Sequence, residues 1–354
     1  MSHVPNAPAF RLGSSQPAPA GGKEDVVFQT RITEMFGIRY PIICGGMFWI
    51  GRAELVAAVA NAGGIGFMVG STFGEDLNAL RAEIRKARDL TDGPIGLNIN
   101  LFPSARPQPI EEWVRITIEE KIPVVETSGR SPEAIVKPLH EAGVKIMHKV
   151  PGVRYARTVE RLGCDAVAIV GYECGGHPGM EMVTSLVLVP LCADAVNIPV
   201  VAGGGFADGR GLVTALALGA DAVLMGTRFM ATQECYGHPA WKEYMVKASE
   251  ADTAFVMRSV GNPIRVAKNA LTDKVLEMEG RGTTIQELLP VIGGAPNVAF
   301  EKGEVENTFV SVGQSMGLVQ DVPTVQELFD RILEQATEAR ERLDGIVPTK
   351  AAAG

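Results

Sequence analysis

The chain has 354 residues, a formal net charge of −8 at pH 7, 46% hydrophobic residues and 21% charged residues. This length can bury a large core, either as two ordinary domains or as one long α/β barrel with an addition. The acidic balance argues against a nucleic-acid partner, because such a partner requires a broad basic surface. No run of about 18 or more uncharged apolar residues occurs, so we expect no membrane span.

The cysteines are sparse and scattered, and no CxxC pair is present: Cys44, Cys164, Cys174, Cys192 and Cys235. This pattern fits a reducing cytoplasm and favours neither a disulfide framework nor a structural zinc site, so we expect a cytoplasmic protein without a metal. Residues 1–27 are rich in Pro, Ala, Gly and Ser and lack the apolar core of a signal peptide, so we interpret them as a flexible N-terminal tail.

From Tyr40 onward, short apolar runs alternate with helix-like segments. The predicted strands are residues 41–46, 64–70, 94–100, 124–129, 145–150, 166–171, 199–204 and 222–227. The predicted helices between them are residues 52–61, 76–90, 110–119, 132–141, 155–162, 183–195 and 209–218. Apolar strands without alternation are typical of a parallel sheet covered on both faces.

Eight βα units predict a (β/α)8 TIM barrel, an α/β fold. The alternative is a doubly wound sheet, but no GxGxxG follows the first predicted strand, where a dinucleotide-binding unit has it. We assign residues 28–235 and 303–347 to the barrel. Residues 236–302 form an inserted, mainly helical subdomain that covers the substrate, with predicted helices at 241–248, 264–279 and 284–289 and a turn at 292–296. A last helix begins after Thr324, which with Glu327 forms a capping box.

The active site of such a barrel lies at the carboxyl ends of the strands, where two loops are rich in glycine. Gly203, Gly204 and Gly205 follow the seventh strand, and Gly226 and Thr227 follow the eighth. Backbone N–H groups of glycine loops, aided by a helix N-terminus, bind phosphate. The alternative is that these glycines only turn the chain.

Three further residues of this face carry reactive side chains. Lys149 ends the fifth strand, as a cation that faces a ligand or as a lysine that reaches the rim. His177, in the loop after the sixth strand, is an acid/base candidate, although a loop histidine can also be merely superficial. Cys174, in the same loop, is a candidate nucleophile but fits a small buried cysteine better.

Several separated motifs resemble the nitronate monooxygenase/2-nitropropane dioxygenase-like family of FMN-containing TIM barrels, over about residues 28–347. These motifs are residues 41–47 (PIICGGM), 62–64 (AGG), 96–98 (GLN), 148–149 (HK), 175–179 (GGHPG), 203–209 (GGGFADG) and 225–229 (MGTRF). The loop 173–179 (ECGGHPG) is most similar to the branch that contains NADH:quinone reductases. The position of Cys44 is usually Gln in these relatives.

The resemblance implies the following roles for residues of this chain. The isoalloxazine of FMN would contact Gly45, Gly46 and Met47 and accept hydrogen bonds from Asn98 and Lys149. The phosphate would lie on Gly203, Gly204, Gly205, Gly226 and Thr227, and Gln314 would approach the flavin. His177 would stand beside the flavin and the substrate as the catalytic residue.

The resemblance also implies a reaction. The expected protein is an FMN-dependent oxidoreductase that passes reducing equivalents from NADH or NADPH to a quinone-like acceptor. The alternative is a nitronate monooxygenase that oxidises alkyl nitronates, such as propionate 3-nitronate, with O2. An enoyl-thioester reductase is a weaker alternative, and a barrel that only binds a phosphorylated ligand is the non-enzymatic one. We expect a small-molecule substrate and a possible homo-oligomer.

Overall fold

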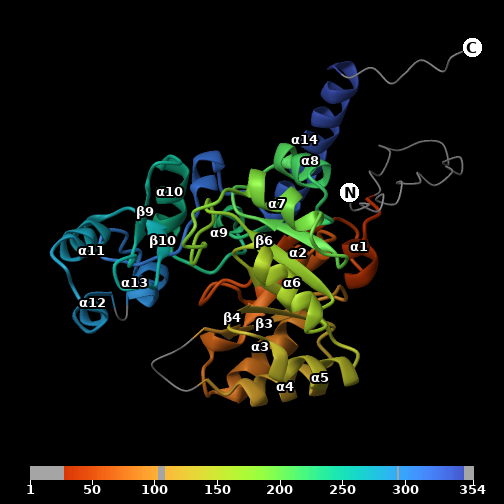
Figure 1. Ribbon diagram of the computed structural model, residues 1–354, viewed down its shortest axis with the longest axis horizontal. Helices are drawn as coiled ribbons and strands as arrows, with labels where there is room; N and C mark the ends of the chain where they lie inside the picture. Colours follow the sequence, from red (N-terminus) through yellow and green to blue (C-terminus); the bar gives the residue numbers. More distant parts are fainter. Residues whose placement is uncertain (1–27, 103–107, 293–294, 347–354) are drawn as a thin grey trace, which may run out of the picture.

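The computed structural model describes residues 28–102, 108–292 and 295–346. The predicted N-terminal tail, the glycines of the predicted turn 292–296 and the end of the chain lie outside these ranges. Within them, eight parallel strands pair in chain order, and β8 pairs with β1 to close a barrel (Figure 1). The TIM-barrel prediction is therefore confirmed.

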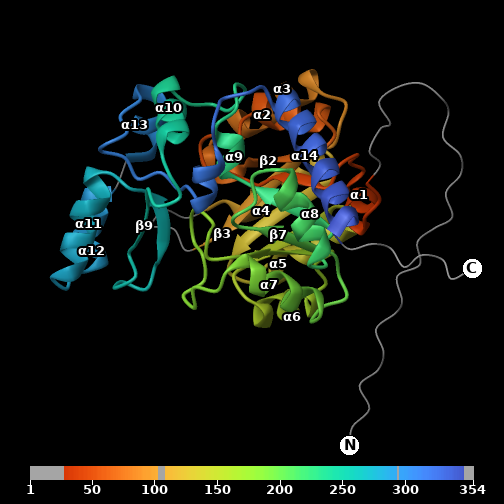
Figure 2. The same ribbon diagram turned by 90° about the horizontal axis from the view of Figure 1, so that it is seen from above.

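All eight predicted strands are present: β1 (Ile42–Cys44), β2 (Ile65–Val69), β3 (Gly96–Leu101), β4 (Val124–Gly129), β5 (Lys145–Val150), β6 (Ala166–Val170), β7 (Val200–Gly203) and β8 (Ala222–Met225). The predicted helices between them are α2 (Ala53–Asn61), α3 (Leu77–Leu90), α4 (Ile110–Glu119), α5 (Glu133–Glu141), α6 (Val153–Arg161), α7 (Ser185–Ala193) and α8 (Gly209–Ala217). They surround the barrel (Figure 2). A short 3-10 turn, η1 (Gly70–Thr72), follows β2.

The barrel interior is a packed core rather than a channel. Inward-facing side chains such as Ile43, Phe67, Met147 and Val201 form one buried cluster. Gly96 makes room for the ring of Phe67, since a Cβ at Gly96 would lie 2.3 Å from that ring. The filled interior leaves the ends of the barrel as the places for a site.

A helix that the sequence did not predict, α1 (Arg31–Phe36), lies at the end of the barrel where the strands begin. Thr30 and Thr33 cap it reciprocally, and Gly37 ends it with φ 66°. Ile32 and Phe36 join the interior cluster. The amino ends of the strands are therefore covered, and the carboxyl ends remain available.

After β8 the chain leaves the βα pattern. Helix α9 (Thr227–Met230) follows directly, and the elements from α10 to α13 form a body beside the barrel (Figures 1 and 2). They are α10 (Pro239–Lys247), β9 (Thr253–Val256), β10 (Ile264–Ala267), α11 (Ala270–Gly280), α12 (Ile285–Ile292) and α13 (Ala295–Lys302). We keep residues 236–302 as our proposal for the bounds of this subdomain.

One helix of the subdomain was predicted wrongly. The predicted helix 264–279 begins with a strand, because β10 pairs antiparallel with β9, and its helical part starts only at Ala270. The alternating Ile264 and Val266 suit a strand, and Asn269 forms a capping box with Thr272 that starts α11. Residue 295, which we assigned to a turn, begins α13.

The chain returns to the barrel through η2 (Gln314–Leu318) and the long α14 (Val325–Ile346). The predicted capping box is confirmed, because the Glu327 N–H donates to Thr324 Oγ1 at 3.2 Å and the Thr324 N–H donates to Glu327 Oε2 at 2.8 Å. Helix α14 packs so closely on α8 that a Cβ at Gly209 would lie 2.2 Å from the Ile332 carbonyl oxygen. None of the described helices is long and apolar enough to cross a membrane.

Candidate active site

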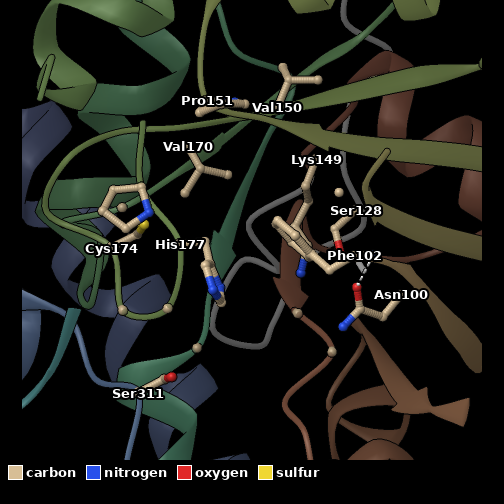
Figure 3. A pocket seen from close by; sticks show the side chains of 18 of the residues that line it. Asn100, Phe102, Ser128, Lys149, Val150, Pro151, Val170, Cys174, His177 and Ser311 are labelled. Carbon is tan, nitrogen blue, oxygen red and sulfur yellow. Dashed lines mark hydrogen bonds between the residues drawn. The ribbon is translucent and has the colours of Figure 1, made fainter. Parts of the chain in front are cut away.

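A cavity of about 770 Å³ opens at the carboxyl ends of the strands (Figure 3). The loops after β1, β6, β7 and β8 line it, together with the ends of β3, β4 and β5. Asn262 and Pro263 of the subdomain also line it.

The floor of this cavity is organised by Glu126 of β4, a residue for which we predicted no role. Its side chain is fully buried. Oε2 accepts hydrogen bonds from the Gly46 N–H at 2.9 Å and from Asn98 Nδ2 at 2.6 Å, and Lys149 Nζ lies 3.1 Å from Oε1. The sequence does contain a signal for this role, a lone carboxylate at the end of the apolar run of β4. Only the fold shows that this side chain points inward.

The predicted glycines after β1 lie directly above this floor. A Cβ at Gly46 would stand 2.6 Å from Asn98 Cβ and 2.7 Å from Glu126 Oε2, and a Cβ at Gly45 would stand 2.9 Å from Leu224 Cδ2. These glycines are required by close approach. Met47 lines the cavity, whereas Cys44 is buried in the core and is not among the lining residues.

Lys149 is not a free cation, because it forms an ion pair with Glu126. Its side chain is 20% exposed and lines the cavity. The ammonium group of Lys149 offers N–H donors at the cavity, while the carboxylate of Glu126 balances its charge. The prediction that Lys149 faces a ligand is compatible with this position, but the pairing with Glu126 was missed.

The glycine loops after β7 and β8 supply free backbone donors. Gly204 and Gly205 have φ values of 90° and 83°, and with Gly226 and Thr227 they line the cavity. Within the described residues, the N–H groups of Gly204, Gly205 and Gly226 donate to no protein acceptor. Gly203 does not line the cavity, and its carbonyl accepts the Gly171 N–H at 3.0 Å.

Two details of the predicted phosphate site differ from expectation. The N-terminus of α8 is already satisfied, since Asp208 accepts from the Gly211 N–H and Gln335 accepts from the Gly209 N–H. The Thr227 hydroxyl accepts the Gly313 N–H at 2.9 Å. The loops, rather than the α8 terminus, therefore present the free donors, and Thr227 also anchors the chain before η2.

His177 stands at the rim, where its ring stacks on Phe102 with centroids 4.7 Å apart and planes 30° apart (Figure 3). The surroundings lower the pKa of its imidazole through burial, and a side-chain hydrogen bond with Asn262 acts in the opposite direction. The residue as a whole is exposed at the rim. Phe102 was not predicted as a site residue.

The rest of the loop after β6 is mainly structural. Both carboxylate oxygens of Glu173 accept the Ser185 N–H at the start of α7, each at 3.0 Å. Burial raises the pKa of the Cys174 thiol to about 12, although part of the residue is exposed. These positions agree with the interpretation that Cys174 is no nucleophile.

Gln314 occupies a different place from the one expected. Its backbone N–H donates to the Glu173 carbonyl at 2.8 Å, and the residue is not among those that line the cavity. Ser311 and Ser315, on either side of it, line the cavity instead.

A buried histidine, His148, forms part of the wall. Its Nδ1 lies 2.7 Å from Thr127 Oγ1. Burial, followed by the charge of Lys149, lowers the pKa of His148 to about 4, so the ring is neutral at pH 7. No three His, Cys, Asp or Glu side chains of the described residues are grouped as a metal ion would require.

The chain is similar to known proteins over most of its length. The model of the nitronate monooxygenase family matches residues 29–335. A 5-hydroxy-7a-methyl-1-oxo-octahydro-1H-indene-4-carboxyl-CoA dehydrogenase of Rhodococcus jostii is 33% identical over 90% of this chain and 98% of its own length. A probable nitronate monooxygenase of Staphylococcus saprophyticus is 30% identical over 88% of this chain and 99% of its own length.

Among solved structures, FabK from Thermotoga maritima is 40% identical and superposes with a TM-score of 0.84, over 91% of this chain and 100% of that one. The fold and the sequence therefore agree over nearly the whole length. The chain belongs to the nitronate monooxygenase family, and the expectation of a flavin-dependent oxidoreductase is confirmed at that level.

Proposed function

We propose that this cavity binds FMN, with the isoalloxazine above the Glu126 floor and the phosphate on the loops after β7 and β8. The glycine N–H groups without protein acceptors fit a phosphate. The backbone of Gly46 lies directly on the floor, where a Cβ would clash with Asn98 and Glu126. Asn98 and Lys149 would then offer donors to the edge of the ring, both held in place by Glu126.

We infer that the reaction passes reducing equivalents from NADH or NADPH to a quinone-like acceptor. The bound FMN would supply the redox chemistry, since it can receive a hydride and pass electrons on. The observation that carries this proposal is the pair of stacked rings, His177 and Phe102, at the rim of the cavity. Stacked flat rings at this place suit a planar nicotinamide or quinone ring.

The protein's own contribution would be position and proton transfer. Burial lowers the pKa of His177 and so favours the neutral imidazole, which can accept a hydrogen bond or share a proton at an acceptor oxygen. The Lys149–Glu126 pair would hold a cation beside developing negative charge. Asn262 and Pro263 of the subdomain would limit access of water from above.

A second candidate is reduction or oxidation of a thioester substrate. It is favoured by the similarity to the CoA-thioester dehydrogenase and to FabK. The cavity also extends past Pro151 to Arg154 and Tyr155 of α6, which gives room for a longer ligand. Nitronate oxidation, the activity for which the family is named, is the third candidate.

One anaerobic experiment separates these candidates. The purified protein, loaded with FMN, is mixed with NADH, NADPH or propionate 3-nitronate while the flavin absorbance is followed. Rapid bleaching by a nucleotide and recovery with benzoquinone supports the quinone reductase, whereas recovery only with an enoyl thioester supports the second candidate. Bleaching by the nitronate alone would overturn both, and a protein that takes up no FMN would overturn all three.

The role of His177 is tested by its replacement. His177→Ala should keep FMN bound but lower kcat with the acceptor by about 100-fold, the usual range for a general acid or base. The matched control is His140→Ala, because His140 lies on α5 and pairs with Asp165 at 2.8 Å, away from the cavity. Unchanged turnover in the His177 variant would contradict the assignment.

A further inference from the structure

A buried arginine of the subdomain, Arg265, lies directly behind the loop that carries His177. It belongs to β10, and only 3% of it is exposed. Among the described residues no carboxylate forms an ion pair with it. A buried cation without a carboxylate is costly, so its surroundings must stabilise it in another way.

Aromatic rings and neutral oxygens take the place of the missing carboxylate. The guanidinium lies 4.3 Å from the Tyr172 ring centroid and 5.6 Å from that of Phe255. These two rings meet edge to face, with centroids 5.3 Å apart. Nη1 donates to Thr253 Oγ1 at 2.9 Å, and Nη2 is buried without a partner. Such an arrangement fixes the guanidinium without neutralising it.

Arg265 also holds the loop at two points. Its Nε donates to the Tyr172 carbonyl at 3.2 Å, where the loop begins. Its backbone N–H donates to the Gly176 carbonyl at 2.7 Å, and its carbonyl accepts the Gly176 N–H at 3.0 Å. Gly176 directly precedes His177 and has a φ of 80°, so this pairing fixes the direction in which the chain enters the histidine.

We propose that Arg265 is a positioning residue, which clamps the segment from Tyr172 to Gly176 onto the subdomain and thereby sets the place of His177 beside Phe102. This inference rests on the proposed role of His177. Arg265 does not line the cavity, so it acts through the loop and not by touching the substrate. The subdomain is then part of the catalytic geometry as well as its cover.

The test compares Arg265→Met with Arg258→Met. Met keeps an unbranched apolar stem and the backbone pairing with Gly176 but removes every side-chain donor. Arg258 is the matched control, since it lies in the same subdomain, 5.7 Å from the same Phe255 ring, but is exposed and has no hydrogen bond to the loop among the described residues. Arg265→Met should lower kcat about 10- to 100-fold with FMN still bound, because small displacements of reacting groups cost that much. Arg258→Met should leave kcat within twofold.

Two further variants keep the test informative if Arg265→Met folds poorly. Arg265→Lys retains the charge but not the fork of donors, and should recover only part of the activity. Thr253→Val removes a single partner of the guanidinium and should lower kcat about threefold. In a His177→Ala background, Arg265→Met should lower kcat no further, since residues that act as a unit are not additive.

A readout independent of turnover comes from NMR titration of the imidazole signals in the protein without FMN. The chain has only five histidines, and His177→Ala assigns the signal of interest. In Arg265→Met the titration midpoint of His177 should move up toward the ordinary histidine value, because the released ring enters water. The midpoint of His177 should be unchanged in Arg258→Met. An unmoved midpoint together with unchanged kcat would overturn the clamp.

These outcomes are separable from those that test the reaction. If no nucleotide bleaches the flavin, the quinone reductase fails, yet the His177 midpoint still reports on Arg265. If the flavin reacts as proposed but the double variant is further impaired than His177→Ala alone, the proposed function stands and the clamp through His177 fails.

Discussion

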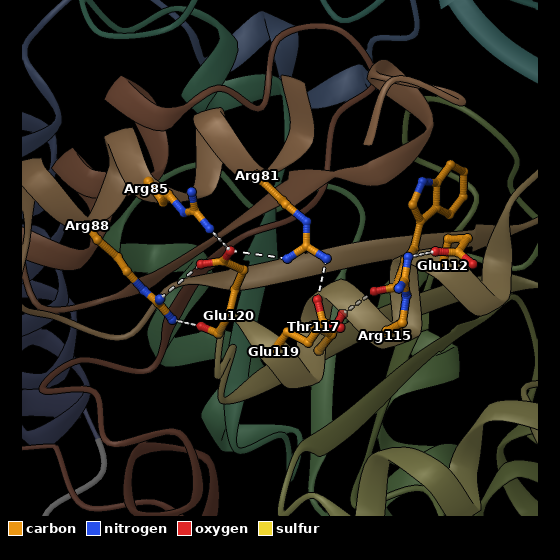
Figure 4. Close-up of polar contacts among 9 residues, drawn as sticks. Arg81, Arg85, Arg88, Glu112, Arg115, Thr117, Glu119 and Glu120 are labelled. Carbon is orange, nitrogen blue, oxygen red and sulfur yellow. Dashed lines mark hydrogen bonds and ion pairs between the residues drawn. The ribbon is translucent and has the colours of Figure 1, made fainter. Parts of the chain in front are cut away.

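Two buried glutamates, six residues apart, serve different ends in this molecule. Glu120, just after α4, meets Arg85 at 2.8 Å, Arg81 at 3.2 Å and Arg88 at 3.6 Å, in the outer layer between α3 and α4 (Figure 4). Glu126 of β4 meets one lysine, one amide and one backbone N–H, and all three of these partners line the cavity.

The difference lies in what the partners do next. The arginines around Glu120 lie on α3 and connect this helix to the end of α4, so the cluster stabilises the packing of the two helices. Asn98 and Lys149 line the cavity and carry more N–H groups than Glu126 uses, so the same kind of interactions hold donors ready for a ligand. A buried carboxylate thus indicates function only when its partners have unused bonding capacity toward a cavity.

The largest expected effect comes from removing the negative charge on the floor. Glu126→Gln would remove the partner charge of Lys149 and replace one acceptor of Gly46 and Asn98 with a donor-bearing amide. We expect FMN affinity to fall by at least about 100-fold, equivalent to roughly 3 kcal/mol. Fluorescence titration with FMN measures this, and affinity within threefold of the wild type would contradict the role of the floor.

The stability of the folded protein should depend on pH through His148, the buried histidine beside the cavity. Because the folded pKa of His148 is lowered to about 4, the unfolded chain binds a proton between pH 6.5 and 4 that the folded chain does not. The contribution of His148 to stability is full above pH 6.5 and falls toward pH 4, by roughly 3 kcal/mol.

Urea unfolding at pH 7 and pH 4.5 tests this dependence. His148→Gln should flatten the decrease, because Gln does not titrate. The control is His140→Gln, at an exposed histidine paired with Asp165. A decrease equally steep in His148→Gln and the wild type would show that other groups cause it.

The outer cluster should affect stability and leave activity alone. Burial raises the pKa of Glu120, but hydrogen bonds and charges from Arg85 and Arg81 outweigh it, so the pKa is lowered overall. Its contribution is present above the ordinary glutamate pKa and is lost as pH falls through the lowered one. Glu120→Gln should cost about 2 kcal/mol at pH 7, with kcat within twofold.

Urea unfolding and steady-state kinetics of the same preparation measure both quantities. A large loss of activity at full FMN occupancy would remove the contrast between the two glutamates. A stability change below about 0.5 kcal/mol would show that the arginines are satisfied by water.

The smallest effect is expected at Cys174. Burial raises the pKa of its thiol to about 12, which keeps the thiol protonated and unreactive at pH 8. Iodoacetamide should label it slowly, and Cys174→Ala should keep kcat within twofold. Fast labelling that abolishes turnover, and that substrate prevents, would restore Cys174 as a reactive group.

Much of the fold could be predicted from the sequence because buried parallel strands are apolar throughout and their helices end at glycines. Helix α1 was missed because six residues carry little periodicity, although Thr30, Thr33 and Gly37 cap it. The strand β10 was missed because Ile264 to Ala267 run directly into a helix, and only pairing with β9 reveals them.

That Asn98, Lys149, His177 and most of the predicted glycines line one cavity could be expected from the sequence, since a TIM barrel gathers the carboxyl ends of its strands at one face. The partners of those residues could not. Glu126 beside Lys149, Phe102 beside His177 and Arg265 behind Gly176 are neighbours only after the barrel closes and the subdomain docks. Residue type and position along a strand are local properties, whereas charge pairing and burial arise from segments brought together in space.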